Sequence, residues 1–161
     1  MKIQDMNNKS EGWRPSRAEL SDFLRAQPLC TLSTVDAVGQ PQGATVAFSE
    51  TQDGDFIVGT SDTSRKVANI DTNPHVAMTI TDAERRYTVQ LEGTARKLGA
   101  EAFAAYADYH YDQLPASRPF RDAPGQVNIL VSPTHIRFSD CNPHPWVLTD
   151  FSSEGRASLL D

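Results

Sequence analysis

Long apolar runs are absent from this 161-residue chain, and no stretch approaches the roughly 20 consecutive apolar residues that a membrane-spanning helix needs. The first residues, MKIQDMNNKSEGW, are polar, whereas a signal peptide would carry an apolar segment there. Positive charge is also scarce, because 21 acidic residues outnumber 15 Lys and Arg and give a formal net charge of −6. Nucleic-acid affinity depends largely on concentrated positive charge. We therefore expect a cytoplasmic protein with neither membrane nor nucleic acid as a partner.

Metal and redox motifs are equally scarce. Cys30 and Cys141 lie too far apart for a CxxC pair, and reduced thiols are the rule in the cytoplasm. The four histidines lack HxH or HxxxH spacing, so no metal site is expected. The sequence shows no convincing catalytic triad or pair of carboxylates either, and the catalytic residues stay unknown at this level.

Length and composition, with 39% hydrophobic residues, suit a single globular domain. A chain of this size buries about 70% of the surface of its unfolded form, which is enough for one core without disulfide or metal staples. Residues 1–15 are predicted to form a flexible N-terminal arm. Residues 16–161 are predicted to form the domain.

Capping residues and apolar spacing predict one helix at the start of the domain and another in its second half. The first runs over residues 16–28, with Ser16 as N-cap, Glu19 completing a capping box and a proline as its stop. The other covers about residues 100–112, where Ala is frequent and aromatic side chains share one face. A proline-rich loop follows it.

Short apolar runs separated by turn residues predict six or seven antiparallel strands in meander order. The runs are LCTLSTV, GATVAFS, FIVGT, HVAMTIT, RYTVQLEGTARKL, VNILVS and THIRFSD. The last twenty residues show no clear period. Small helices inserted between strands in this order are typical of a closed or nearly closed β-barrel.

The segment GTSDTSRKVANIDTNPHV, residues 59–76, is the most informative part of the chain. It runs from the end of a strand through a polar turn into a helix over about residues 63–72. Asp62 or Thr63 is expected to cap this helix, and an Asn-Pro pair ends it.

The first turn of that helix carries Ser64, Arg65 and Lys66. Cations next to the positive end of a helix dipole cost about 0.3–1 kcal/mol each when exposed. A bound anion reverses that sign, because free backbone N–H groups, two hydroxyls and two basic side chains then surround it. The hydroxyls are those of Thr60 and Ser64. The alternative is that both basic side chains are solvated and that the turn is ordinary capping.

Three segments resemble the pyridoxamine 5′-phosphate oxidase-like flavoproteins with the FMN-binding split barrel. They are TLSTVDAVGQPQGATVAF at 31–48, GTSDTSRKVANIDTNPHVAMTI at 59–80 and VQLEGTARKL at 89–98. The resemblance implies a mainly β fold, an antiparallel split barrel of six or seven strands with peripheral helices. It also implies a homodimer that holds FMN in clefts between the subunits.

The resemblance also implies which residues contact the cofactor. The strand ending at residue 48 lines the flavin with backbone groups, and the basic pair after residue 64 binds its phosphate. The expected contacts are Thr45, Val46, Ala47, Phe48, Gly59, Thr60, Ser64, Arg65, Lys66, Thr88, Gln90 and Trp146. Gln90 is a second candidate beside Thr88, either of which would donate to the N1 and O2 edge of the flavin. Trp146 is expected from the partner subunit, although these last three residues also suit solvent exposure or packing.

Two departures separate this chain from the true oxidases that the resemblance names. Their FMN-lining strand begins with Arg and ends with Lys, where this chain has Gly43 and Phe48. The C-terminal Arg-x-His substrate signature is also missing. Pyridoxamine phosphate is therefore not expected as the substrate.

Taken together, the sequence predicts an FMN-dependent oxidoreductase with an unknown small-molecule substrate and with NADH or NADPH as a candidate electron donor. Because the flavin supplies the chemistry, no acid or base has to be visible in the sequence. Two alternatives stay open. One is a non-catalytic flavin-binding stress or sensor protein, and the other is a deazaflavin-dependent reductase on the same fold.

Overall fold

The computed structural model describes residues 11–152. In chain order the elements are α1 (Arg17–Arg25), β1 (Leu29–Val35), β2 (Pro41–Ala47), β3 (Ser49–Glu50), β4 (Phe56–Ser61), α2 (Arg65–Thr72), β5 (His75–Asp82), β6 (Tyr87–Leu98), α3 (Ala100–Ala104), α4 (Ala107–Gln113), the 3-10 helix η2 (Pro115–Phe120), β7 (Gln126–Asp140) and β8 (Val147–Ser152). Within this range no helix combines the length and apolarity needed to cross a membrane.

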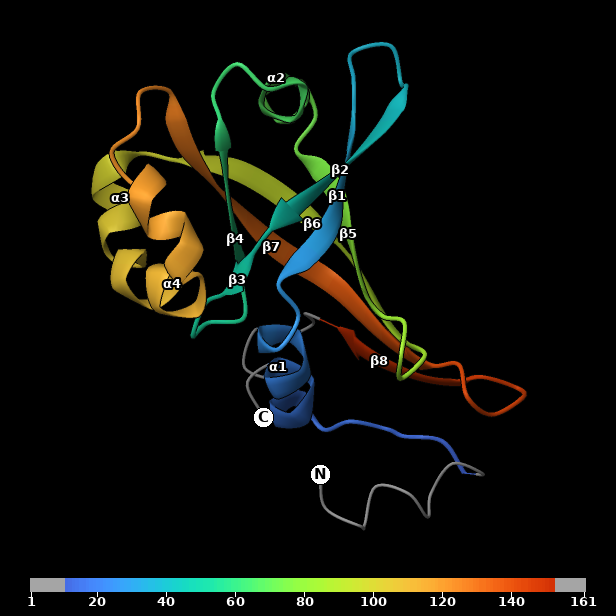
Figure 1. Ribbon diagram of the computed structural model, residues 1–161. Helices are drawn as coiled ribbons and strands as arrows, with labels where there is room; N and C mark the ends of the chain where they lie inside the picture. Colours follow the sequence, from blue (N-terminus) through green and yellow to red (C-terminus); the bar gives the residue numbers. More distant parts are fainter. Residues whose placement is uncertain (1–10, 153–161) are drawn as a thin grey trace.

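All eight strands belong to one antiparallel sheet, in the order β2-β1-β5-β6-β7-β4-β3, with β8 added beside β7. The sheet curls so that β2 approaches β4, but no strand ladder joins the two. The barrel is therefore split along this line (Figure 1). The predicted fold class, an antiparallel split barrel with few helices, is confirmed.

The main core fills the inside of the curled sheet. Alternate residues of each strand point inward, as Val89 and Leu91 do on β6, because side chains of a strand alternate between faces. Val67 and Ile70 of α2 join the same core, so α2 closes one end of the barrel. A second apolar cluster lies between the sheet and the α3–α4 pair.

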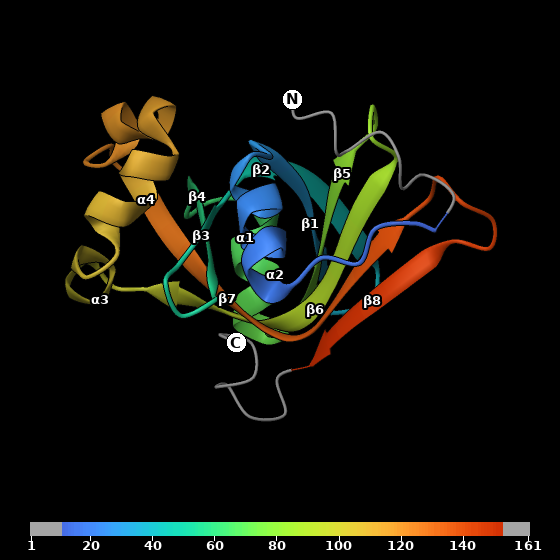
Figure 2. The ribbon, with the colours of Figure 1, turned by 90° about the horizontal axis from the view of Figure 1, so that it is seen from below.

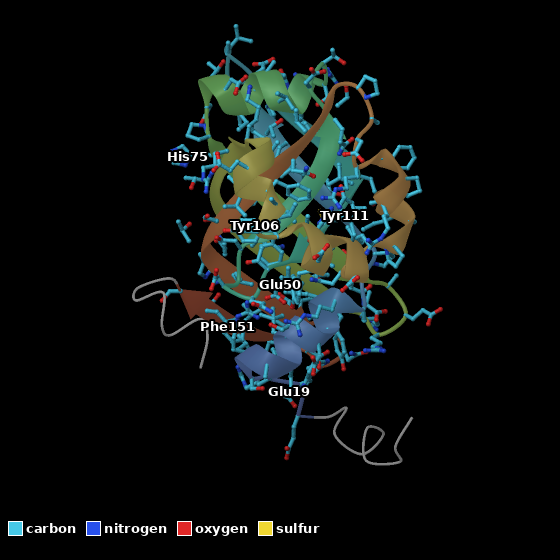
Figure 3. The ribbon with its side chains drawn as sticks, turned by 90° about the vertical axis from the view of Figure 1, so that its left-hand side faces the viewer. Glu19, Glu50, His75, Tyr106, Tyr111 and Phe151 are labelled. Atoms are coloured by element: carbon cyan, nitrogen blue, oxygen red, sulfur yellow. The ribbon has the colours of Figure 1, made fainter. Side chains whose placement is uncertain are left out.

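The helix α1 has the predicted capping box, because Ser16 Oγ accepts from the Glu19 amide and the Glu19 carboxylate accepts from the Ser16 amide. An ion pair between Arg17 and Glu50, both buried, joins α1 to β3. The Glu50 amide in turn donates to the side chain of Gln113 on α4 (3.2 Å). Figure 3 shows Glu50 between α1 and α4.

Part of the predicted flexible arm is packed against the sheet. The Trp13 ring lies 5.0 Å from Phe138 and 5.2 Å from Tyr87, centroid to centroid, and its amide donates to Asp140 Oδ2 (2.7 Å). Apolar and hydrogen-bonding contacts thus fix residues 11–15, for which the prediction of a flexible arm was wrong. Residues 1–10 and 153–161 lie outside the described part of the chain.

Four other details of the prediction also differ from the structure. The two runs VNILVS and THIRFSD form the single strand β7, and the helix expected over residues 100–112 is divided into α3 and α4. The strand β8 lies in the final segment, where no period was visible. Ser64, rather than Asp62 or Thr63, is the N-cap residue of α2.

Candidate functional site

Polar side chains converge where β4 passes into α2. Lys66 Nζ donates to Thr60 Oγ1 (3.1 Å), and Thr60 Oγ1 donates to Ser64 Oγ (3.4 Å). The connection between β4 and α2 is short, so the last residues of the strand lie beside the first turn of the helix. The structure therefore brings three of the predicted phosphate-site residues together.

The N-terminus of α2 lacks the usual capping groups. Ser64 makes no side-chain cap hydrogen bond, and the first turn contains no acidic residue. The backbone N–H groups of Arg65 and Lys66 precede the first hydrogen bond of the helix ladder. Within residues 11–152, the exposed Arg65 side chain has no hydrogen-bond or ion-pair partner. Free amides, a positive helix end and two cations make a site that favours an anion.

The adjacent opening in the barrel is bordered by the unpaired edge of β2 and by the part of β4 that extends beyond its short pairing with β3. Along β2, Thr45 and Ala47 face outward, whereas Val46 packs against the core. Phe48 is buried in that core, with its ring 6.0 Å from that of Phe56. The prediction that Phe48 contacts a cofactor therefore holds at most for its backbone, because a ligand in the opening cannot reach its side chain.

A pocket of about 100 Å³ lies beside this opening. Ala47 and Gly59 form the wall on the barrel side, and His110, Tyr111 and Phe120 close it from α4 and η2. Figure 3 shows Tyr111 on the side of the molecule where α4 lies. A drug-sized ligand needs roughly 300–1,000 Å³. The pocket of a single chain therefore suits only part of a ligand.

The polar groups of the pocket are uncharged. Burial lowers the pKa of His110 to about 4, so its imidazole is neutral near pH 7. Its Nδ1 lies 2.6 Å from Ser49 Oγ, which leaves Nε2 as the nitrogen available to another partner. Gln126 of β7 adds an amide to the lining. These groups suit hydrogen bonding to a neutral ligand.

Thr88, Gln90 and Trp146 lie in another part of the molecule. Thr88 pairs with Ser139 near the β5–β6 turn, and the 60% exposed Trp146 lies in the β7–β8 hairpin. Figures 1 and 2 show this hairpin on the side of the molecule opposite α3 and α4. The structure does not bring these three residues to the α2 N-terminus within one chain.

The predicted residue Gln90 belongs to a polar row across the outer face of the sheet. Consecutive pairings connect the row Thr45, Thr31, Thr79, Gln90, Arg137 and Asp150. Arg137 donates to both carboxylate oxygens of Asp150 (2.8 and 3.2 Å), and these bonds lower the pKa of Asp150. The row leaves this face polar, with three threonines on β2, β1 and β5.

Sequence reasoning did not place His110, Gln126 or Asn128 near the site. His110 lies on the aromatic face of the predicted helix over residues 100–112, and it packs edge-on against Phe103 and Tyr111. Gln126 and Asn128 are brought close to the site only by the pairing of β7 with β4, which places Asn128 opposite Gly59. No local pattern in the sequence indicates that register.

Comparison with known proteins agrees with the fold and with the segments that carry the resemblance. The family model described as pyridoxamine 5′-phosphate oxidase matches residues 16–139. A pyridoxine/pyridoxamine 5′-phosphate oxidase from Haemophilus influenzae is 36% identical over 75 residues, which are 47% of this chain and 36% of that protein. The chain thus spans well under half the length of that curated relative.

Two solved structures share the architecture at low sequence identity. The heme-binding protein from Mycobacterium smegmatis has a TM-score of 0.73 at 19% identity, covering 92% of this chain and 61% of the other. A pyridoxamine 5′-phosphate oxidase-related, FMN-binding protein from Nostoc punctiforme has a TM-score of 0.64 at 12% identity, covering 87% and 97%. At these low sequence identities, the structural similarity shows a shared fold and nothing more. With the family model matching most of its length, the chain belongs to the pyridoxamine 5′-phosphate oxidase family.

Proposed function

We propose that this protein binds FMN and acts as an FMN-dependent oxidoreductase. The observation that carries the proposal is the hydrogen-bonded group of Lys66, Thr60 and Ser64 at the uncapped N-terminus of α2. A phosphate there accepts hydrogen bonds from free amides and is paired with two cations. Family membership and an FMN-binding protein of the same fold support the choice of FMN as the bearer of that phosphate.

The open edges of β2 and β4 suit the rest of this cofactor. Strand edges offer backbone N–H and C=O groups, which match the donors and acceptors along the rim of a flavin. Thr45, Ala47 and Gly59 present small side chains beside these edges, leaving room for a flat ring. When bound, FMN supplies hydride and one-electron transfer, and the chain supplies binding and orientation.

A homodimer completes the proposed site. Thr88, Gln90 and Trp146 lie too far from the α2 N-terminus of their own chain to act there. A two-fold dimer that packs through the threonine-rich outer face brings these residues to the opening of the other subunit. Each of the two sites then combines a phosphate anchor from one chain with flanking residues from the other.

The substrate of this oxidoreductase is proposed to be a small molecule other than pyridoxamine phosphate, with NADH or NADPH as the electron donor. Gly43 lacks a side chain, and Phe48 is buried in the core. Neither supplies the cation that a substrate phosphate needs, and each such charged hydrogen bond is worth about 1.5–3 kcal/mol. The neutral lining of the pocket agrees with this difference.

The absorption spectrum of the purified protein tests the cofactor, after reconstitution with FMN if the preparation is colourless. Bound FMN gives the two visible flavin bands, and the released chromophore is identified by mass. A Soret band would instead indicate heme, and preference for a deazaflavin would change the cofactor within the same fold. Bound FMN that neither NADH nor NADPH reduces in stopped-flow mixing would favour the non-catalytic flavin-binding alternative.

A further inference from the structure

Asn128 carries a buried oxygen without a hydrogen-bond partner. The residue is 8% exposed, and its Oδ1 bonds to no group in the described part of the chain. Leaving a buried acceptor unpaired is unfavourable, so a native protein retains one where something else completes it. Asn128 lies on β7 directly opposite Gly59 of β4, which lines the pocket.

The space above Gly59 is bordered by a donor and an acceptor. A Cβ atom at this position would lie 3.5 Å from Asn128 Oδ1 and 2.8 Å from Gln126 Nε2. Glycine therefore leaves the backbone of residue 59 uncovered, and an atom placed above it requires the end of the flexible Gln126 side chain to move. Gln126 Nε2 is held only by a long bond of 3.4 Å to the carbonyl of the adjacent Val127, so its amide is free to turn.

This space lies next to the proposed phosphate anchor. Gly59 directly precedes Thr60, which binds Lys66, and neighbouring residues of a strand are about 3.3 Å apart. Because the two residues point to opposite faces of β4, a ligand that reaches both must cross the free edge of the strand. In FMN the segment bonded to the phosphate is the hydroxyl-bearing ribityl chain. A hydroxyl is both donor and acceptor, so a single one satisfies Asn128 Oδ1 and accepts from Gln126 Nε2.

We infer that Asn128 and Gln126 are specificity-determining residues that bind a ribityl hydroxyl of the flavin over Gly59. The inference rests on the proposed function, because it places the phosphate at Lys66. It assigns to β7 a binding role that depends on hydrogen bonding and not on charge. Lumiflavin has the same ring system without a ribityl chain, so its affinity should not depend on Asn128 or Gln126.

Asn128→Leu tests the role directly, because leucine has a similar size and no polar atoms. We expect the melting temperature of the cofactor-free variant to equal or exceed that of the wild type, since the unpaired acceptor is gone. Its affinities for FMN and riboflavin should fall about tenfold, or roughly 1.4 kcal/mol. Its affinity for lumiflavin should not change. Quenching of flavin fluorescence on titration measures all three dissociation constants.

Gly59→Ala is the second variant; it covers the backbone of residue 59 and leaves the Asn128 side chain in place, in ordinary van der Waals contact with the new methyl group. Its closest contact is the end of the flexible Gln126 side chain, so the variant should fold. We expect the same selective loss of FMN and riboflavin affinity. Gln52→Leu, in the exposed turn between β3 and β4, is the matched control and should bind all three flavins as the wild type does.

Two results would overturn the inference while leaving the proposed function intact. One is wild-type affinity for FMN and riboflavin in both variants. The other is an equal loss for lumiflavin, accompanied by a lower melting temperature of Asn128→Leu, which would mean that Asn128 serves folding by pairing with Gln126. A wild-type protein that binds none of the three flavins would instead overturn the proposed function, and this inference with it.

Discussion

The ammonium group of Lys66 is held beside the positive end of α2 by one hydrogen bond, to Thr60. Without an anion this position is unfavourable, because the charge and the helix dipole repel each other by about 0.3–1 kcal/mol. Arg65, the residue before Lys66, adds a second cation, and its side chain has no partner among residues 11–152. Residues that cost folding energy in the empty protein are typical of binding sites.

Replacing these two cations separates phosphate binding from ring binding. Lys66→Ala and Arg65→Ala should each weaken FMN binding by about 1.5–3 kcal/mol, because each removes a charged hydrogen-bond donor. Riboflavin has no phosphate, so its affinity should stay near that of the wild type. Isothermal titration calorimetry with both flavins gives the comparison.

Lys97→Ala is the control for this experiment, since Lys97 is an exposed lysine that pairs with Asp71 on the surface. It should bind FMN normally. Equal losses of FMN and riboflavin affinity in the Lys66 and Arg65 variants would show that the anion site has been misplaced.

At the residue scale, prediction succeeded where neighbours in sequence are also neighbours in space. Thr60, Ser64 and Lys66 lie within one strand-to-helix turn, and hydrogen bonds join them there. The inward direction of Phe48 and the unpaired oxygen of Asn128 were not predicted. Both depend on strand alternation and register set by distant parts of the chain.

Among the elements, α4 is fixed to β3 through a buried polar contact. His110 Nδ1 lies 2.6 Å from Ser49 Oγ, and the ring is packed among the aromatic side chains of α3 and α4. Burial disfavours the charged imidazolium, which lowers the pKa of His110 from 6.5 to about 4. The His110 ring is therefore neutral in the folded protein near pH 7.

Stability should fall as the medium is acidified through this range. Between pH 6.5 and about 4 the unfolded chain protonates this histidine while the folded chain does not, so unfolding takes up a proton. The free energy of unfolding should decrease by up to about 1.4 kcal/mol per pH unit from this group. Urea unfolding at pH 7 and pH 5 measures the change, and His110→Gln should reduce it. An unchanged pH dependence in that variant would contradict the assignment.

Prediction of the elements depended on local signals. The start of α1 was predicted because its capping box lies within four consecutive residues. Pro133 suggested a break in β7, but the strand continues past it at a shift of register opposite Gly93. A Cβ at Gly93 would lie 2.2 Å from the backbone oxygen of Ser132, so glycine is required for this close approach. Such a contact between distant segments leaves no local pattern.

For the whole molecule, the arrangement of the predicted site residues has a direct consequence. One chain carries an anion site at the α2 N-terminus and, at a different place, the exposed residues Gln90 and Trp146. If both groups contact one flavin, two chains must contribute. Each subunit then supplies half of each of two sites.

Mixing defective subunits tests this shared site. Lys66→Ala and Trp146→Ala should each weaken FMN binding in a homodimer. A mixed dimer of the two variants places both defects in one site and leaves the other intact, so it should bind one FMN with wild-type affinity. Co-expression with two affinity tags isolates the mixed dimer, and flavin stoichiometry provides the measurement.

Thr79→Arg supplies the matching control, since it places a charge at the centre of the outer polar row. It should yield monomers by light scattering and weaken FMN binding together with dimerisation, whereas Glu101→Arg on α3 should do neither. A mixed dimer no better than its parents would show that each site belongs to a single chain.

The barrel class followed from the series of short apolar runs, because sequential antiparallel strands usually pair. The strand order did not follow a simple meander, because β1 pairs with β5, β4 pairs with β7 and no ladder joins β2 to β4. The separation of Gln90 and Trp146 from the α2 N-terminus of the same chain was visible only in the structure. It depends on the curvature of the sheet and on which edges remain unpaired, and neither has a sequence signature. Only resemblance to the family suggested that Trp146 acts from a partner subunit.

The unpaired edge of β2 and the part of β4 beyond its pairing with β3 are also a hazard. Exposed rows of backbone donors and acceptors recruit strands from other molecules, which is how many β proteins begin to aggregate. Whatever fills the opening also shields both rows. We therefore expect the cofactor-depleted protein to form insoluble assemblies during storage. Adding the ligand back should slow this loss.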